Sequence, residues 1–343
     1  MNRLEAYNDK SNRNGLSTMD LKTIAKEIRE FEGVTRKKPI ADLINIFESV
    51  RPEYSNSVVD FGDDAAVIDI GGEDYVLFAA DGIWARLIEA SMWWAGYSSV
   101  LVNVNDIAAM GGKPVAMVNV LSSINKNACQ ELLRGMKDGV AKFGVPMVGG
   151  HLHPDTPYTS LSVAIIGTVK KGCEIRSSTA RPGDSIIAAY DMDGRMGPNS
   201  PYSFDSTTMK EPEDVRAKYR VMQALGEKHL LTAGKDISNP GVIGTLGMLV
   251  ETSRVGARVD LTKIPAPMDV DFIQWLKVHP ATGFIVTSLP ENEAEVVRLF
   301  EGAGYGASVI GSIEESSKLD ICHGDERVTV FDFKTDVVTG ITQ

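Results

Sequence analysis

The segment Asn103-Val104-Asn105-Asp106-Ile107-Ala108-Ala109-Met110-Gly111-Gly112 ends a stretch, starting near residue 96, that predicts a long helix. The glycine pair suits the end of this helix, because glycine adopts positive φ at little cost. Most side chains here are apolar, yet Ser99, Asn103 and Asp106 lie four and three residues apart and so share one face. An unpaired buried carboxylate is costly. Asp106 therefore needs a cationic partner, either a lysine or arginine or a metal ion.

Two further acidic motifs precede this helix. Gly62-Asp63-Asp64-Ala65-Ala66 places adjacent carboxylates between strands predicted at 58–59 and 65–70, and Asp81 follows a strand predicted at 75–80. Each motif alone is also compatible with an ordinary turn. Together with Asp106 they predict a cluster of carboxylates that a divalent cation could join, since magnesium prefers oxygen ligands and often bridges carboxylates to phosphates.

Two segments offer backbone geometry suited to phosphate. Gly149-Gly150-His151 follows a predicted strand, and glycine lets a ligand approach the backbone closely. The segment from residue 235 to 241 opens a helix, with Asn239 as the expected N-cap and Pro240 at the first helical position. Helix N-termini attract anions, although a helix that is merely well capped shows the same pattern.

The chain divides into two halves of mixed helix and strand pattern, which predicts an α+β protein of two domains. Residues 18–175 form the predicted N-terminal domain, residues 176–343 the C-terminal domain, and residues 1–17 a flexible extension. The strands predicted at 115–121 and 161–169 carry apolar side chains on both faces. One small sheet cannot hide so much apolar surface, so we predict a homodimer formed through the N-terminal domain.

Composition narrows the class of protein. With 343 residues, 43% of them hydrophobic, the chain can build a large core. Its formal charge of -11, from 46 acidic and 35 basic residues, disfavours a nucleic-acid or membrane-surface partner. No apolar run is long enough to span a membrane and no signal peptide is evident. Three scattered cysteines fit a reducing compartment, so we predict a soluble cytoplasmic protein.

These motifs, in this order, resemble a superfamily that contains aminoimidazole ribonucleotide (AIR) synthetase, thiamine-monophosphate kinase, selenophosphate synthetase, the hydrogenase maturation factor HypE and formylglycinamidine synthetase. The resemblance runs from about residue 24 to 311 and rests most strongly on the segment 103–112 quoted above. Within the superfamily the chain is most similar to AIR synthase-related branches of unassigned activity. The loop at residues 33–38 resembles the methanogenesis marker two branch.

The resemblance implies an AIR synthetase-like fold, with an N-terminal domain that forms a dimeric β-barrel with its twin and a C-terminal α/β sandwich. It also implies Mg²⁺ and ATP in a cleft between the domains. The implied magnesium ligands are Asp63, Asp64, Asp81, Asp106 and Asp236. The implied nucleotide contacts are Lys37, Lys38, Asn103, Gly149 and Gly150. The candidate catalytic residues are Asp81, Asp106 and His151.

We therefore predict an enzyme that uses ATP and magnesium for phosphoryl transfer to, or activation of, a small-molecule substrate. His151 and Asn239 stand where the kinase branch of the superfamily has aspartates. This loss of charge favours one alternative, a catalytically silent nucleotide-binding dimer that acts as an assembly or regulatory partner. Another alternative is a metal-dependent hydrolase that uses His151 and His153. Selenide chemistry is not expected, because the first cysteine is Cys129, inside a predicted helix.

Overall fold

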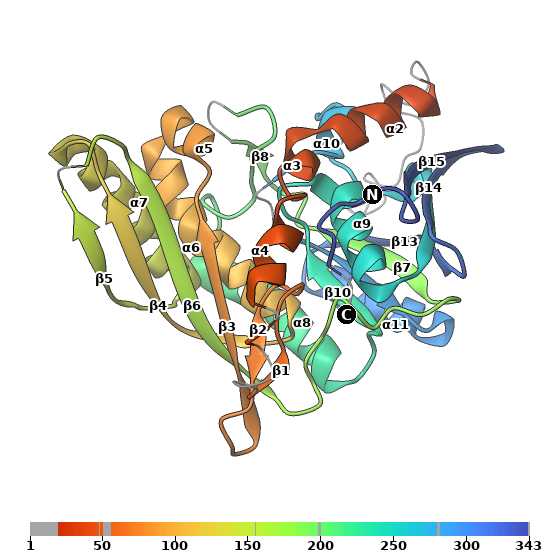
Figure 1. Cartoon of the computed structure of the whole chain (residues 1–343), viewed down its shortest axis with the longest axis horizontal. Coiled ribbons are helices and arrows are strands. Elements are labelled where there is room, and N and C mark those ends of the chain that lie inside the picture. The colour runs from red at the N-terminus through yellow and green to blue at the C-terminus, as the bar shows by residue number, and fades with distance from the viewer. Residues whose placement is uncertain are drawn as a thin grey trace.

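Six strands of the first half form one mixed sheet, in the order β1-β2-β3-β6-β4-β5 (Figure 1). The computed structural model describes residues 20–47, 49–50, 56–154, 156–197, 200–279 and 282–341; the predicted extension, residues 1–17, lies outside them. β4 and β5 are parallel, and the other neighbours are antiparallel. The strands are β1 Ser57–Val59, β2 Ala66–Ile68, β3 Asp74–Gly82, β4 Lys113–Ser122, β5 Met147–His153 and β6 Ser160–Lys170.

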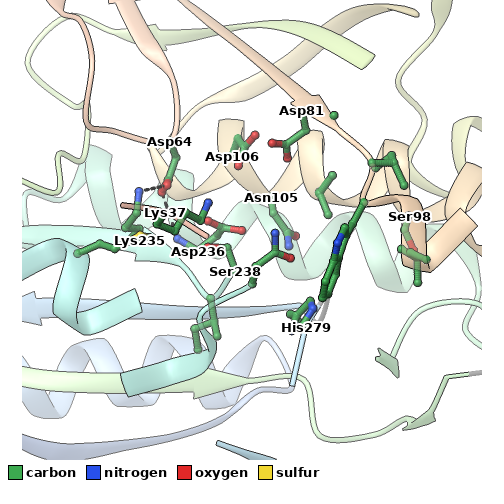
Figure 2. Close-up of a pocket in the computed structure, with 18 of the residues that line it drawn as sticks. Lys37, Asp64, Asp81, Ser98, Asn105, Asp106, Lys235, Asp236, Ser238 and His279 are labelled. Carbon is green, nitrogen blue, oxygen red and sulfur yellow. Dashed lines mark hydrogen bonds and ion pairs between the residues drawn. The ribbon is translucent and has the colours of Figure 1, made fainter. Parts of the chain in front are cut away.

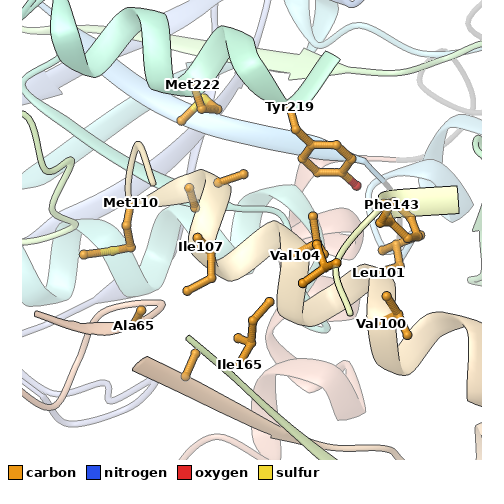
Figure 3. Packing of buried hydrophobic residues seen from close by; sticks show 14 of the residues in the cluster. Ala65, Val100, Leu101, Val104, Ile107, Met110, Phe143, Ile165, Tyr219 and Met222 are labelled. Carbon is orange, nitrogen blue, oxygen red and sulfur yellow. The ribbon is translucent and has the colours of Figure 1, made fainter. Parts of the chain in front are cut away.

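Helices α6 (Met92–Ala109) and α7 (Lys126–Phe143) pack together against one face of this sheet. Their close approach requires glycine, because a Cβ at Gly96 would lie 2.1 Å from the carbonyl oxygen of Leu132. Figure 3 shows apolar side chains of α6 lying between Ile165 of β6 and two residues of α8 (Pro212–Glu227), Tyr219 and Met222. The long helix predicted near residues 96–110 is confirmed, and Gly111 follows its end with φ 72°.

The second half forms a seven-stranded sheet with helices on both faces. Its order is β10-β12-β7-β13-β11-β14-β15, antiparallel except for the β11–β14 pair. The strands are β7 Ser185–Tyr190, β10 Ala233–Asp236, β11 Gly256–Asp260, β12 Gly283–Ser288, β13 Gly306–Glu314, β14 Lys318–His323 and β15 Glu326–Asp332. α8 and α11 (Glu293–Gly302) share one core with Ile187, whereas α9 (Gly241–Ser253) shares another with Ile186. This alternation along β7, an interior strand of the sheet, explains why residues 186–189 are all apolar.

Helix α2 (Leu21–Glu30) packs against the second sheet, although the predicted boundaries assign it to the first domain. The Arg29 guanidinium donates to the carbonyl oxygen of Val330 at 2.9 and 2.7 Å. The chain continues through α3 (Glu32–Thr35). A loop was predicted there, but the segment is helical and buries Val34 in the second core.

The remaining elements are α4 Ile40–Phe47, α5 Ala85–Ala90, α10 Phe272–Trp275, 3₁₀ turns Leu261–Lys263 and Pro290–Asn292, and the pair β8 Arg195–Met196 and β9 Phe204–Asp205. In the described parts of the chain, no helix combines the length and apolarity needed to cross a membrane.

Candidate functional site

A cleft of about 510 Å³ lies where the two halves meet. Its walls come from the β1–β2 turn, β3, α5 and α6 on one side, and from β10 and the turn before α9 on the other. The segment after α3 and residues 200–202 complete it. Small-molecule sites commonly occupy roughly 300–1,000 Å³, so the cleft is large enough for a ligand of that kind.

Three carboxylates from three different elements meet at one end of this cleft. Asp64 lies in the β1–β2 turn, Asp106 on α6, and Asp236 at the end of β10. One oxygen of each lies within 4.8 Å of those of the other two. Figure 2 shows them together, with Asp81 of β3 beside Asp106. We call these four aspartates, with the lysines Lys37 and Lys235, the acidic end.

Burial and mutual repulsion act on these carboxylates in the same direction. Burial raises the pKa of Asp106 well above its usual range, and the charges of Asp81 and Asp236 raise it further. Burial and the charge of Asp64 likewise raise the pKa of Asp236. Burial also raises the pKa of Asp81, with Lys37 opposing it. The cluster is therefore short of positive charge, which a cation would supply.

Two lysines partly neutralise the acidic end. Lys235 Nζ forms an ion pair with Asp64, and the Asp236 backbone N–H donates to the same carboxylate at 3.2 Å. Burial alone would lower the pKa of Lys235, but Asp64, Asp63 and Asp236 outweigh it and hold it above its usual value. Burial lowers the pKa of Lys37, with Asp81 opposing. Both lysines line the cleft.

The donors of the acidic end fit magnesium. They are carboxylate oxygens from separate rigid elements, and hard oxygen donors are the ligands that magnesium prefers. Asp64, Asp106 and Asp236 would hold the ion, with Asp81 adjacent. The carboxyl groups of Asp81 and Asp106 are also the two candidate catalytic groups that the structure places in the cleft.

Asp63, predicted as a fifth ligand, has a different environment. Its side chain accepts hydrogen bonds from the backbone N–H groups of Asp64 (3.1 Å) and Ser177 (2.8 Å). Burial raises its pKa to about 6, with Lys235 opposing. Asp63 lines the cleft but is not one of the three converging carboxylates. Its hydrogen bonds instead fix the turn that carries Asp64.

Four of the five predicted nucleotide contacts lie outside the cleft, and Asn103 and Lys38 are two of them. Asn103 is fully buried, its side-chain N–H donates to the Ser99 carbonyl oxygen at 2.8 Å, and the cleft is lined instead by Asn105 and Asp106. Of the polar stripe Ser99, Asn103 and Asp106, Asp106 lines the cleft and the other two do not, because α6 turns a neighbouring face to it. Lys37 lines the cleft, whereas Lys38 is exposed and does not.

The glycine–histidine motif also lies away from the cleft. Gly149, Gly150 and His151 are exposed on β5, the outer edge strand at the left of Figure 1. The His151 and His153 rings lie 4.5 Å apart. Among the described residues, no third histidine, cysteine or carboxylate completes a metal site with them. Within one chain these residues and the acidic end are separate.

The turn before α9 also differs from its prediction. The helix begins at Gly241 rather than Pro240, and Asn239 forms no side-chain capping bond to it. The Gly241 N–H closes the turn by donating to the Ser238 carbonyl oxygen at 2.9 Å. Ser238 and Asn239 line the cleft next to Asp236.

The opposite end of the cleft is aromatic, and no motif in the sequence predicted it. Phe31, Trp84, Tyr202 and His279, here called the aromatic end, come from four separate segments. The His279 ring centroid lies 6.1 Å from Phe31, 6.2 Å from Trp84 and 6.4 Å from Tyr202. Burial lowers the pKa of His279 to about 4, so its ring is neutral at physiological pH. No spacing rule links these residues in the sequence.

Comparisons with known proteins agree with this architecture. The family models "AIR synthase related protein, N-terminal domain" and "C-terminal domain" match residues 62–169 and 181–323. Uncharacterized protein MJ0640 of Methanocaldococcus jannaschii is 50% identical over 323 residues, covering 94% of this chain and 100% of that protein. Uncharacterized protein sll0787 of Synechocystis is 40% identical over 317 residues, covering 92% and 97%.

Among solved structures, Thermotoga maritima PurL complexed with ATP has a TM-score of 0.68 and 18% sequence identity to this chain. The match covers 81% of this chain and 46% of that one, so this chain corresponds to about half of PurL. This likeness confirms the predicted two-domain fold. The chain belongs to the AIR synthase-related family.

Proposed function

We propose that the protein catalyses magnesium-dependent phosphoryl transfer from ATP to a small molecule, or its ATP-driven activation, in the cleft between its halves. One observation carries this proposal: carboxylates from three elements converge within 4.8 Å, and two lysines line the same cleft. Phosphoryl transfer depends mainly on positioning and on charge neutralisation. The acidic end offers groups for both.

Each group of the acidic end has a part in the proposed chemistry. Magnesium bound by Asp64, Asp106 and Asp236 would neutralise phosphate charge. Lys37 and Lys235 add positive charge beside it. Asp81 lies outside the trio and is therefore free to accept a proton from the substrate.

The alternative of a catalytically silent nucleotide-binding protein uses the same cleft. Asn239, which stands where the kinase branch has an aspartate, lines the cleft and brings no charge to it. ATP turnover above background, measured with and without candidate acceptors, distinguishes the two. The hydrolase hypothesis has less support, because His151 and His153 lie outside the cleft.

Magnesium should be required for tight ATP binding. At a concentration of about 100 times its dissociation constant, Mg-ATP should raise the free energy of unfolding by roughly 2.7 kcal/mol. ATP with a chelator should give a much smaller increase, because the carboxylates would repel the phosphates. Melting curves with Mg-ATP, ATP plus EDTA, and magnesium alone test this. Equal shifts with and without magnesium would contradict the proposal.

We also propose a homodimer through the open face of the first sheet. Phe78, Ile166, Val118 and Val120 are 40–49% exposed. Register places Phe78 opposite Ile166, and Val118 and Val120 opposite the adjoining residues of β6, so the four share the face that α6 and α7 leave uncovered. The apolar second face predicted for 115–121 and 161–169 is thus present and is not hidden within one chain. A second copy would cover it.

A charge on this face should break the dimer. Val118→Lys should give a monomer in sedimentation at micromolar concentration, because burying an unpaired ammonium group is costly. Ile70→Lys is the matched control, since Ile70 is 72% exposed and lies beyond the end of β2. It should leave the dimer intact. A wild-type protein that sediments as a monomer at the same concentration would contradict the proposal.

A further inference from the structure

We propose that the aromatic end binds a planar, uncharged heteroaromatic ring, which belongs to a molecule whose reacting group lies at the acidic end. Only the position of the reacting group at the acidic end rests on the proposed function. The ring site itself follows from three observations: the aromatic walls of that end, its neutral histidine, and a buried hydroxyl group without a partner in the same cleft.

The walls suit a flat ring. Phe31, Tyr202 and Trp84 surround His279 at 6.1–6.4 Å between centroids, and all four line the cleft. The Arg36 guanidinium lies 4.8 Å above the Trp84 ring centroid, which fixes one side of the indole. Aromatic side chains bind flat rings by stacking, which is favourable for any base because each has a π face.

His279 presents no charge to such a ring. Its Nδ1 lies 3.0 Å from the Lys277 carbonyl oxygen. A carbonyl oxygen can only accept, so Nδ1 carries the proton and Nε2 keeps its lone pair as an acceptor. Burial and the charges of Arg36 and Lys37 keep the ring neutral. The site thus favours an uncharged ring with an N–H donor over a cationic one.

Ser98 gives the second, independent indication of a ligand. It lies on α6, lines the cleft, and is 0% exposed. Its hydroxyl group has no hydrogen-bond partner among the described residues. A buried hydroxyl group without a partner is costly, so a polar atom of a ligand at this position would satisfy it. Ser99, its neighbour, donates to the Gly96 carbonyl oxygen at 2.7 Å and needs no ligand.

The aromatic and acidic ends are close enough for one bound molecule to reach both. Ser98 and Asp106 are eight residues apart on α6, which is about 12 Å along the axis. Figure 2 shows Asn105 and Ser238 between the carboxylates and His279. A ring at the aromatic end can therefore be joined by a short polar linker to a group at the acidic end. The ring is either the adenine of ATP or part of the second substrate.

Two binding arms distinguish these sources. The first compares Mg-ATP with Mg-tripolyphosphate, which has the phosphates but no ring, by calorimetry. The second adds cytosine or imidazole-4-carboxamide to protein saturated with Mg-ATP and detects ring binding by ligand-observed NMR. Both use the full chain as wild type, Trp84→Leu and Ser98→Ala. The matched controls are Trp93→Leu, which lies outside the cleft, and Ser99→Ala.

If adenine occupies the site, Trp84→Leu should weaken Mg-ATP about tenfold or more and leave Mg-tripolyphosphate unchanged. If the second substrate occupies the site, Trp84→Leu should leave the affinities for Mg-ATP and for Mg-tripolyphosphate unchanged. The free heterocycles should then bind wild type but not Trp84→Leu. In both cases Ser98→Ala should weaken ring binding while the melting temperature stays the same or rises. Ser99→Ala should lower the melting temperature and leave ring binding unchanged.

The inference is overturned if Trp84→Leu affects Mg-ATP and Mg-tripolyphosphate equally and no free heterocycle binds. A fall in melting temperature for Ser98→Ala equal to that for Ser99→Ala would assign its hydroxyl group to the fold. If Mg-tripolyphosphate fails to bind while the heterocycles still bind, the proposed function is contradicted but the ring site is supported. The two failures are therefore distinguishable.

Discussion

Replacing Asp106 with asparagine should abolish most of the magnesium-dependent stabilisation by ATP while leaving the apo protein as stable as before, or more so. Asparagine keeps the size and shape of the side chain and removes its charge. Asp106 has no lysine or arginine within ion-pair distance among the described residues, and burial with repulsion from Asp81 and Asp236 raises its pKa. Removing one of several carboxylates that repel one another should stabilise the apo protein. The roughly 2.7 kcal/mol expected from saturating Mg-ATP should largely disappear.

Asp63→Asn is the matched control for this experiment. It lines the same cleft and adjoins Asp64, but its oxygens already accept two backbone N–H groups. Its replacement should cost about 1–3 kcal/mol of stability, because the amide nitrogen replaces one of the two accepting oxygens and leaves one backbone N–H without its acceptor. Asp63 is not one of the three converging carboxylates, so the magnesium dependence should be preserved. Paired melting curves of the apo and Mg-ATP forms separate the two effects. A destabilised Asp106→Asn that binds Mg-ATP normally would show that Asp106 is structural.

The sequence predicted the elements of the fold better than their packing. The helix at 96–110, the strands around it and the two-domain class follow from periodicity and glycine placement, and they are confirmed. Helix α2 shows the limit. Its spacing of Leu21, Ile24 and Ile28 predicts one buried face, but not the sheet that covers it. It packs on the second sheet, hundreds of residues away in the chain.

The same limit explains which site residues were predicted. Asp64 and Asp106 were predicted because carboxylates in apolar segments need a partner, whereas Asp236 was implied by the family resemblance. The structure brings the three together. Asn103 was predicted to face the ligand, and this could not be decided from the sequence because α6 is buried on nearly all sides. A helix without an exposed face gives no reference from which the direction of each polar side chain can be predicted. The aromatic end was missed because aromatic side chains in a sequence normally indicate core.

Lys235 is the cation on which the acidic end depends, and Lys235→Met should cost about 3–5 kcal/mol of stability in the absence of metal. Its side chain is 7% exposed and that of Asp64 is 4% exposed, so the substitution leaves a buried carboxylate unpaired. Methionine keeps the apolar contacts of the lysine stem. Magnesium alone should restore part of the loss, because it supplies the missing positive charge. Melting curves in EDTA and in magnesium measure both effects.

The loss caused by Lys235→Met should grow as pH rises from 6 to 8. Lys235 lowers the pKa of Asp63, Asp106 and Asp236, so its removal raises all three further. A carboxyl group whose pKa is raised on folding contributes stability at low pH, and this is lost as pH rises through the raised value. Lys37→Met is the matched control. Lys37 lines the same cleft, but burial lowers its pKa, whereas the pKa of Lys235 is raised by its carboxylate neighbours. Removal of Lys37 should therefore cost less stability than removal of Lys235 at either pH. Equal losses in the two variants, independent of pH and magnesium, would mean that packing of the lysine stems, rather than charge, holds the acidic end together.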